Sequence, residues 1–222
     1  MKMNRISIYI IAFILLLFSC SKLKNTRGNS SFDSPQEEYI MSGEASQPMR
    51  VFLISNKKDS ILLRTKSLDV IPDPNDLVLQ NFAKRLHRTV IDSLSMGVGI
   101  AAPQVGILRN IICVQRFDKD GFPFETYLNP KILQYSDLKQ PCLEGCLSIP
   151  HRMDTTKTRA YAILLDYDKL DGTHKTEMVE DFTAVIFQHE IDHLNGILYI
   201  DHLEEHGKKD RSSNDPPENK RN

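Results

Sequence analysis

The feature that most constrains this chain is the pattern His-Glu-x-x-His, which residues 188–193 (QHEIDH) contain. His189 and His193 stand four residues apart, so an α-helix would carry both imidazoles on one face, one turn from each other. Both could then reach a single metal ion, with Glu190 beside them as a candidate general base. The largely apolar run 182–187 before the pattern is typical of a core helix. Because an unpaired buried charge is costly, the pattern favours a metal site over a core helix with two hydrogen-bonded histidines and a solvated glutamate.

The N-terminal segment, residues 1–19, has the composition of an export signal. A basic start precedes an apolar core, residues 8–18, which is too short to span a bilayer comfortably. Residues 17–20 (LFSC) resemble the lipobox of bacterial lipoproteins, in which the signal is removed before a cysteine that is then acylated. We therefore expect a lipid anchor on Cys20 and an exported, membrane-associated protein. The alternatives for this segment are an uncleaved signal anchor or a buried apolar segment. If the segment is not used as a signal, the protein would be cytoplasmic.

Composition divides the rest of the chain into three parts. Residues 20–48 are polar and rich in Ser, Asn, Gln and Glu, which predicts a flexible tether. Residues 204–222 carry many charges and almost no apolar side chain, which predicts a disordered, solvated tail. Residues 49–203 remain as one domain with a single core. A net charge of −1 and the absence of Trp give no sign of a nucleic-acid partner, and the three cysteines other than Cys20 do not imply a disulfide framework.

The hydrophobic pattern of the domain predicts an α+β fold. Apolar residues recur at intervals of three and four over residues 77–94, which predicts an amphipathic helix. Runs rich in β-branched and aromatic residues, separated by turns that contain glycine, predict strands at 111–114, 125–132 and 160–167, and another that ends at 179. We expect short, mainly antiparallel strands around a central metal-binding helix.

Two further segments contain candidate site residues. Residues 97–106 are dense in Gly and Ala, which lets a backbone approach a ligand or another strand closely, and Gln104 is the polar side chain there with the reach to contact an oxyanion. Residues 142–150 contain Cys142 and Cys146, but no second cysteine pair completes a four-cysteine zinc site. One thiolate and the two helix histidines would give three protein ligands and leave a fourth position open, as in catalytic sites.

Three segments, in this order, resemble the signature motifs of peptide deformylases: 97–104 (GVGIAAPQ), 144–148 (EGCLS) and 188–193 (QHEIDH). The resemblance extends over about residues 49–203. It implies a peptide deformylase-like fold and a metal-dependent hydrolase that removes the N-formyl group from an N-terminal formyl-methionine and releases formate. The implied partner is a formyl-methionyl peptide or protein N-terminus, and we expect a monomer.

The resemblance also implies which residues perform the chemistry. Cys146, His189 and His193 would hold one divalent ion, Fe²⁺ or alternatively Zn²⁺, which acidifies the attacking water. Glu190 would take the proton from that water and deliver it to the leaving amine.

Further residues are implied to bind the substrate. The Gln104 amide and the backbone N–H of Leu147 would stabilise the negative charge that develops on the formyl oxygen. The residues expected to contact the peptide or its methionine side chain are Val98, Gly99, Gly145, Phe182, Val185 and Ile186.

The segment 151–159 departs from the family pattern. Met153 stands about where an arginine is expected, so the affinity for substrate beyond the formyl-methionine is expected to differ. Arg159 is expected to lie within salt-bridge distance of Asp192, a contact that would orient the metal ligands.

Two other functions share part of this pattern. A membrane-tethered zincin-type metallopeptidase also contains His-Glu-x-x-His and would take a third ligand from His202 or His206. A metal-binding or formyl-peptide-binding module without turnover would keep the same residues. Release of formate from formyl-methionyl peptides distinguishes the hydrolase from both.

Overall fold

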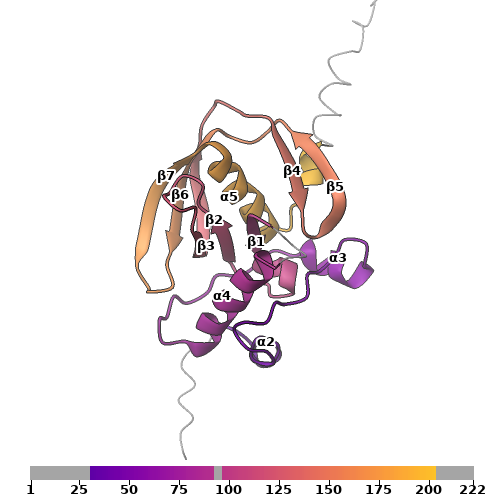
Figure 1. Ribbon diagram of the computed structural model, residues 1–222, viewed down its shortest axis with the longest axis vertical. Helices are drawn as coiled ribbons and strands as arrows, with labels where there is room; N and C mark the ends of the chain where they lie inside the picture. The colour runs from indigo at the N-terminus through magenta and orange to yellow at the C-terminus, as the bar shows by residue number, and fades with distance from the viewer. Residues whose placement is uncertain (1–30, 93–96, 204–222) are drawn as a thin grey trace, which may run out of the picture.

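The computed structural model describes residues 31–92 and 97–203 (Figure 1). The predicted signal, Cys20 and the predicted tail fall outside these residues. No helix of the described part is long and apolar enough to cross a membrane. In chain order the elements are α2 (Ser34–Met41), α3 (Lys57–Leu63), α4 (Leu77–Val90), β1 (Gly99–Ala101), the 3-10 helix η1 (Ala102–Val105), β2 (Ile111–Gln115), β3 (Phe124–Tyr135), β4 (Cys142–Cys146), β5 (Ile149–Thr156), β6 (Ala162–Asp168), β7 (His174–Glu180) and α5 (Asp181–Leu194).

Two antiparallel sheets hold the described residues together. The larger sheet has five strands in the order β1-β2-β3-β6-β7, and the smaller one is the β4–β5 hairpin. In Figure 1, α5 runs through the centre of the molecule, with the hairpin on one side of it and β6–β7 on the other. Within the described part of the chain, β1 and β4 each pair with one strand, so each has one free edge. The predicted α+β class with a central helix is confirmed.

The larger sheet is covered by a helix on each face. Successive residues of a strand point to opposite faces, so Ile111 and Cys113 of β2 pack in the cluster that contains α4. Ile112 and Val114 pack in the cluster that contains α5. Eleven of the 14 residues of α5 are buried, so the His-Glu-x-x-His pattern lies in the protein interior.

Helix α4 confirms the amphipathic helix predicted from residue 77, but it ends at Val90 rather than at residue 94. The Asp76 side chain caps its first turn by accepting hydrogen bonds from two backbone N–H groups. At the other end, the backbone N–H of Gly97 donates to the carbonyl of Val90, so the chain has turned back toward the end of the helix by Gly97.

The prediction of a tether over residues 20–48 is wrong for its described part, residues 31–48. Helix α2 forms there behind a capping box and packs against α4. Phe32 and Ile40 are buried among the α4 side chains, and the buried Arg85 guanidinium donates to the backbone carbonyl of Ile40 at 2.7 Å. The polar average of the segment concealed two apolar side chains that reach the core.

The strands predicted from apolar runs are confirmed as β2, β3, β6 and β7, with ends that differ by a few residues. The hairpin β4–β5 was not predicted. Most of its side chains are exposed or polar, and the buried Glu144 stands where an apolar residue would have revealed the alternation of a strand.

Candidate metal centre and active site

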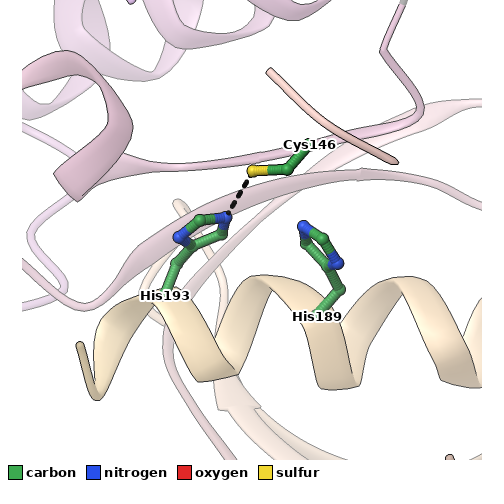
Figure 2. Close-up of side chains that lie close together, drawn as sticks. All are labelled: Cys146, His189 and His193. Atoms are coloured by element: carbon green, nitrogen blue, oxygen red, sulfur yellow. Dashed lines mark hydrogen bonds between the residues drawn. The ribbon is translucent and has the colours of Figure 1, made fainter. Parts of the chain in front are cut away.

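The three predicted metal ligands come together at one point between α5 and the end of β4. Figure 2 shows the imidazoles of His189 and His193 pointing from the helix toward the sulfur of Cys146. Cys146 Sγ lies 3.2 Å from His193 Nε2, and one ligand atom from each of the three residues lies within 4.8 Å of the others. The helix supplies two ligands one turn apart, and the strand delivers the third from 43 residues earlier in the chain (189 − 146).

The donor set fits a divalent transition metal. Bonds from Zn²⁺ to imidazole nitrogen and thiolate are about 2.0–2.3 Å, so donors around one tetrahedral ion lie roughly 3.3–3.8 Å apart. The spacing of the three residues is compatible with that arrangement after small side-chain adjustments. Thiolate and imidazole donors suit zinc and iron rather than magnesium or calcium. Three protein ligands leave a position open for a reacting molecule.

Glu144, to which the sequence analysis gave no role, orients His189. Its Oε2 lies 2.8 Å from His189 Nδ1, which leaves the other ring nitrogen of His189 for a metal. Arg159 donates to both oxygens of the same carboxylate, at 2.8 and 2.9 Å, and the Thr156 hydroxyl donates as well. Burial acts to raise the pKa of Glu144, but the hydrogen bonds from His189 and Arg159 hold that pKa well below its usual range. Glu144 is therefore an anion that fixes the ring orientation of a metal ligand.

The predicted pair of Arg159 and Asp192 is confirmed. Arg159 Nη1 lies 2.6 Å from Asp192 Oδ2, and the Arg159 side chain is only 3% exposed. The same oxygen of Asp192 lies 2.8 Å from His202 Nε2. His202, one of the two candidates for the third ligand of a zincin-type peptidase, therefore pairs with Asp192, and His206, the other candidate, lies outside the described residues.

Glu190 is next to the metal ligand His189 in α5, and one of its carboxylate oxygens has no hydrogen-bond partner. The residue is 4% exposed, and its Oε2 has no hydrogen-bond partner. Burial raises the pKa of Glu190 to about 7, which suits a group that must both accept and return a proton near neutral pH. A Cβ at position 99 would collide with Glu190 Oε1 and would come within 2.8 Å of Ile186 Cγ2. The close approach of β1 to this carboxylate therefore requires glycine at position 99.

The Gln104 side chain is oriented by the backbone. Its Oε1 accepts a hydrogen bond from the N–H of Ala101 at 2.9 Å, so its amide N–H₂ group points the other way. The Nε2 atom lies 3.5 Å from Cys146 Sγ and 3.3 Å from Ser148 Oγ. The amide thus directs its donors to the metal ligand, and Leu147 of the same loop borders the same cavity.

A cavity of about 1050 Å³ adjoins these groups. It lies along the segment that leads into β1 and along β4, and the first two turns of α5 close it on a third side. Among its lining residues are all six that were predicted to bind the substrate: Val98, Gly99, Gly145, Phe182, Val185 and Ile186. Glu190, Gln104, Leu147, Cys146 and His189 line it as well, whereas His193 lies behind them and is only 1% exposed.

The sequence contains one signal for the role of Glu144, its spacing from Cys146. Residues 144 and 146 are two apart, so a strand places both side chains on one face. A carboxylate two residues before a metal-binding thiolate is therefore positioned to contact the other ligands, once the segment is known to be a strand.

Comparison with known proteins gives one family. The family model described as polypeptide deformylase matches residues 51–209. A peptide deformylase of Desulforudis audaxviator is 36% identical over 155 residues, which cover 69% of this chain and 94% of the relative. A peptide deformylase of Finegoldia magna is 34% identical over 140 residues, which cover 63% of this chain and 82% of the relative.

Solved structures agree with the sequence comparisons. A class I type b peptide deformylase from Acinetobacter baumannii with Met-Ala-Ser bound has a TM-score of 0.63 at 31% identity, covering 71% of this chain and 99% of that one. A peptide deformylase from Thermotoga maritima has a TM-score of 0.60 at 31% identity, covering 70% of this chain and 97% of that one.

Proposed function

We propose a mechanism for this chain on one established premise: it belongs to the polypeptide deformylase family and removes the N-formyl group from nascent peptides. The observation that supports the mechanism is the convergence of one thiolate and two imidazoles beside a buried carboxylate whose Oε2 has no partner. Water and the formyl amide are consumed, and formate and a free α-amine are formed.

In the proposed mechanism, Cys146, His189 and His193 hold the metal, and Glu190 moves the proton. A metal ion held by these three residues would supply Lewis acidity to the formyl carbonyl and to the attacking water. Glu190 accepts a proton from the water molecule while the oxygen of that water attacks the formyl carbon. The carboxyl group then delivers that proton to the amine nitrogen as the C–N bond breaks.

Two donors are proposed to stabilise the oxyanion. Negative charge develops on the formyl oxygen when water adds, and donors that are already oriented stabilise it without reorganisation. The Gln104 amide is held toward the site by the backbone N–H of Ala101, and the backbone N–H of Leu147 is the second donor.

The peptide is proposed to bind as an added strand between β1 and β4. Both strands have a free edge within the described residues, and both border the cavity. Backbone hydrogen bonds to such edges hold a peptide regardless of its sequence, while pockets for alternate side chains give specificity. The methionine side chain then occupies the apolar part of the cavity, which is formed by Val98, Phe182, Val185 and Ile186.

Formate release tests this function directly. The purified, metal-loaded chain is expected to release formate from formyl-Met-Ala-Ser, and Cys146→Ser is expected to lose both bound metal and turnover. Cys113→Ser is the matched control, because Cys113 is buried in the α4 cluster and burial raises the pKa of its thiol to about 12. Cleavage of internal peptide bonds would indicate a peptidase. Metal and peptide binding without any formate would indicate a binding module.

Fe²⁺ is proposed as the resident ion, with Zn²⁺ as the alternative. Thiolate and imidazole donors accept both metals, so the donor set alone does not choose between them. Metal analysis of protein purified without oxygen, with turnover measured after reloading with each ion, is expected to give iron. Zinc in the protein as isolated, with full turnover, would reverse the assignment.

We propose further that Cys20 is acylated and that the enzyme is an exported, membrane-anchored monomer. The support is the basic start, the short apolar core and the LFSC sequence of the N-terminal segment. Its substrates would then be formylated peptides or formylated N-termini outside the cytoplasm. Labelled fatty acid is expected in the wild-type protein and not in Cys20→Ser, which should leave the membrane fraction. Unlabelled wild-type protein in the cytoplasmic fraction would refute the anchor, and a dimer mass by light scattering would refute the monomer.

A further inference from the structure

The outer part of the cavity carries two exposed apolar side chains, Leu143 of β4 and Met153 of β5. Their exposed fractions are 58% and 61%, and both residues line the cavity. The hairpin register pairs Gly145 with Met153 and Leu143 with Thr155, so Leu143 and Met153 are diagonal neighbours on one face. Single exposed apolar side chains are normal on a protein surface, but a pair at the opening of a substrate cavity indicates a binding contact.

Gly145 lets the two side chains form one surface. It contributes no side chain to the face between them, and Met153 lies over it, with Cγ 3.2 Å and Cε 3.6 Å from the place of a Cβ on residue 145. The Met153 side chain thus extends along β4 on the face that Leu143 occupies. A methionine at this place can also adapt its shape to different apolar partners.

The charged side chains Arg152, Asp154 and Glu144 of the β4–β5 hairpin form ion pairs and hydrogen bonds away from Leu143 and Met153. Arg152 Nε lies 2.7 Å from Asp154 Oδ2, and the Tyr199 hydroxyl lies 3.3 Å from the same carboxylate oxygen. Both charged residues flank Met153 in the strand and therefore point to the opposite face. Glu144, which also lies on that opposite face, is bound to Arg159. The face that holds Leu143 and Met153 also carries the hydroxyl of Thr155, but it carries no Asp, Glu, Lys or Arg.

The register of an added peptide strand decides which substrate residue meets this face. Side chains alternate between the two faces of a sheet, and the face of β4 with Glu144 and Cys146 is the one turned toward the metal ligands. A formyl-methionine whose carbonyl group reaches the ligands directs its side chain to the inner side, toward Val185 and Ile186. The next residue then points to the outer face, beside Leu143 and Met153.

We propose that Leu143 and Met153 form a subsite for the side chain that follows formyl-methionine, and that this subsite selects apolar over charged residues. The inference rests on the deformylase function and adds a preference at the second position of the substrate. Burying a charged side chain against two apolar ones removes its water without providing a partner, whereas an apolar side chain gains contact area.

Paired peptides measure the preference. The metal-loaded full chain is expected to hydrolyse formyl-Met-Leu-Ser with a kcat/KM about tenfold above that for formyl-Met-Glu-Ser or formyl-Met-Lys-Ser, as expected for one partly enclosed apolar contact. The pair formyl-Met-Ser-Leu and formyl-Met-Ser-Glu should differ by less than about threefold, since the third residue points away from this face. Equal rates for the first set, or a larger effect at the third position than at the second, would overturn the proposal.

Matched variants assign the preference to the two residues. Met153→Lys and Leu143→Lys are each expected to remove the preference for Leu over Glu. Met178→Lys and Leu138→Lys should retain it, because Met178 and Leu138 are 57% and 64% exposed and do not line the cavity. If the preference survives in both cavity variants, these side chains do not form the subsite.

A binding measurement separates failure of the subsite from failure of the hydrolase. Titration of the same peptides into Glu190→Gln, which retains the metal ligands, should give the same ranking of affinities without turnover. If no peptide releases formate from the wild-type chain, the proposed function fails, but the ranking of affinities still supports or overturns the subsite.

Discussion

Three arginines are buried in the described part of the chain. Arg85 donates to backbone carbonyls, whereas Arg159 and Arg116 are each surrounded by carboxylates, and only one of these two clusters reaches the cavity. Arg159 and Arg116 are both 2% exposed. Arg159 binds Glu144 and Asp192, and Glu144 binds the metal ligand His189. Arg116 binds Asp118 and Glu177 and donates to the hydroxyl of Tyr127 at 2.7 Å, on the face of the larger sheet covered by α5.

The difference between the clusters shows that a buried ion pair does not by itself mark a functional site. Both arginines have a raised pKa because their carboxylate partners outweigh the effect of burial. The Arg159 cluster differs because it leads to a histidine with a second ring nitrogen still available and to Glu190, whose Oε2 has no partner. Most buried polar atoms in proteins have a hydrogen-bond partner. Buried polar atoms without a partner, next to a group of side chains whose hydrogen bonds are all made, therefore indicate a functional site.

The largest expected effect is a loss of formate release, which should follow a substitution in the active site and not one in the Arg116 cluster. Glu190→Gln removes the group that accepts and returns the proton, so formate release should fall by about 10²–10⁴-fold while the metal stays bound. Glu177→Gln is the control in the Arg116 cluster, and its kcat should stay within about threefold of wild type. Activity assays with metal analysis test both variants, and retention of full activity by Glu190→Gln would contradict its role.

Replacing each arginine tests whether the clusters differ in stability. Arg159→Met leaves Glu144 buried without its cation, and Glu144 is only 4% exposed, so we expect a loss of about 3–5 kcal/mol in the free energy of unfolding. Arg116→Met should cost less, about 1–3 kcal/mol, because water can reach its partners Asp118 and Glu177, which are 31% and 30% exposed. Urea denaturation of the metal-free proteins measures both losses. Equal losses would mean that exposure of the partners does not matter.

Replacing a carboxylate of the Arg159 cluster should weaken metal binding, whereas replacing one beside the Arg116 cluster should not. Glu144→Gln removes the anion that orients His189, and loss of such a contact weakens metal binding by about 10–100-fold. Glu125→Gln, beside the Arg116 cluster, should leave the affinity unchanged, because Glu125 contacts Lys119 and Tyr127 but no metal ligand. Competition with a chromophoric chelator gives both affinities. An unchanged affinity in Glu144→Gln would show that His189 is held by other contacts.

The smallest expected effect concerns acid stability. The hydrogen bonds from Arg116 lower the pKa of Asp118 in the folded protein. A depressed folded-state pKa stabilises the fold above the unfolded-state value, about 4, and this stabilisation is lost as the pH falls through the folded-state value. The Tm difference between wild type and Asp118→Asn should therefore shrink steadily from pH 6 to pH 3. Parallel Tm curves for the two proteins over this range would refute the shift.

What the sequence predicted well was local or carried by short motifs. The spacing of His189 and His193 determines their common face on a helix, and the pairing of Arg159 with Asp192 was inferred from the motif that contains Asp192. Glu144 was missed because its partners lie 15 and 45 residues away, and its local signal, the two-residue spacing from Cys146, can be used only once the segment is known to be a strand. The β4–β5 hairpin was missed for a related reason: its inner face carries a carboxylate and a thiolate instead of apolar side chains.

Helix α2 changes where this domain can be cut. A fragment that starts at Met49, the first residue of the domain predicted from composition, would lack Phe32 and Ile40 and would uncover the α4 side chains beneath them. It would also remove the carbonyl groups of Tyr39 and Ile40, which accept hydrogen bonds from the buried guanidinium of Arg85. Recombinant versions without the N-terminal segment should therefore begin before Phe32, and poor solubility of shorter versions would reflect a missing part of the core and say nothing about the chemistry of the site.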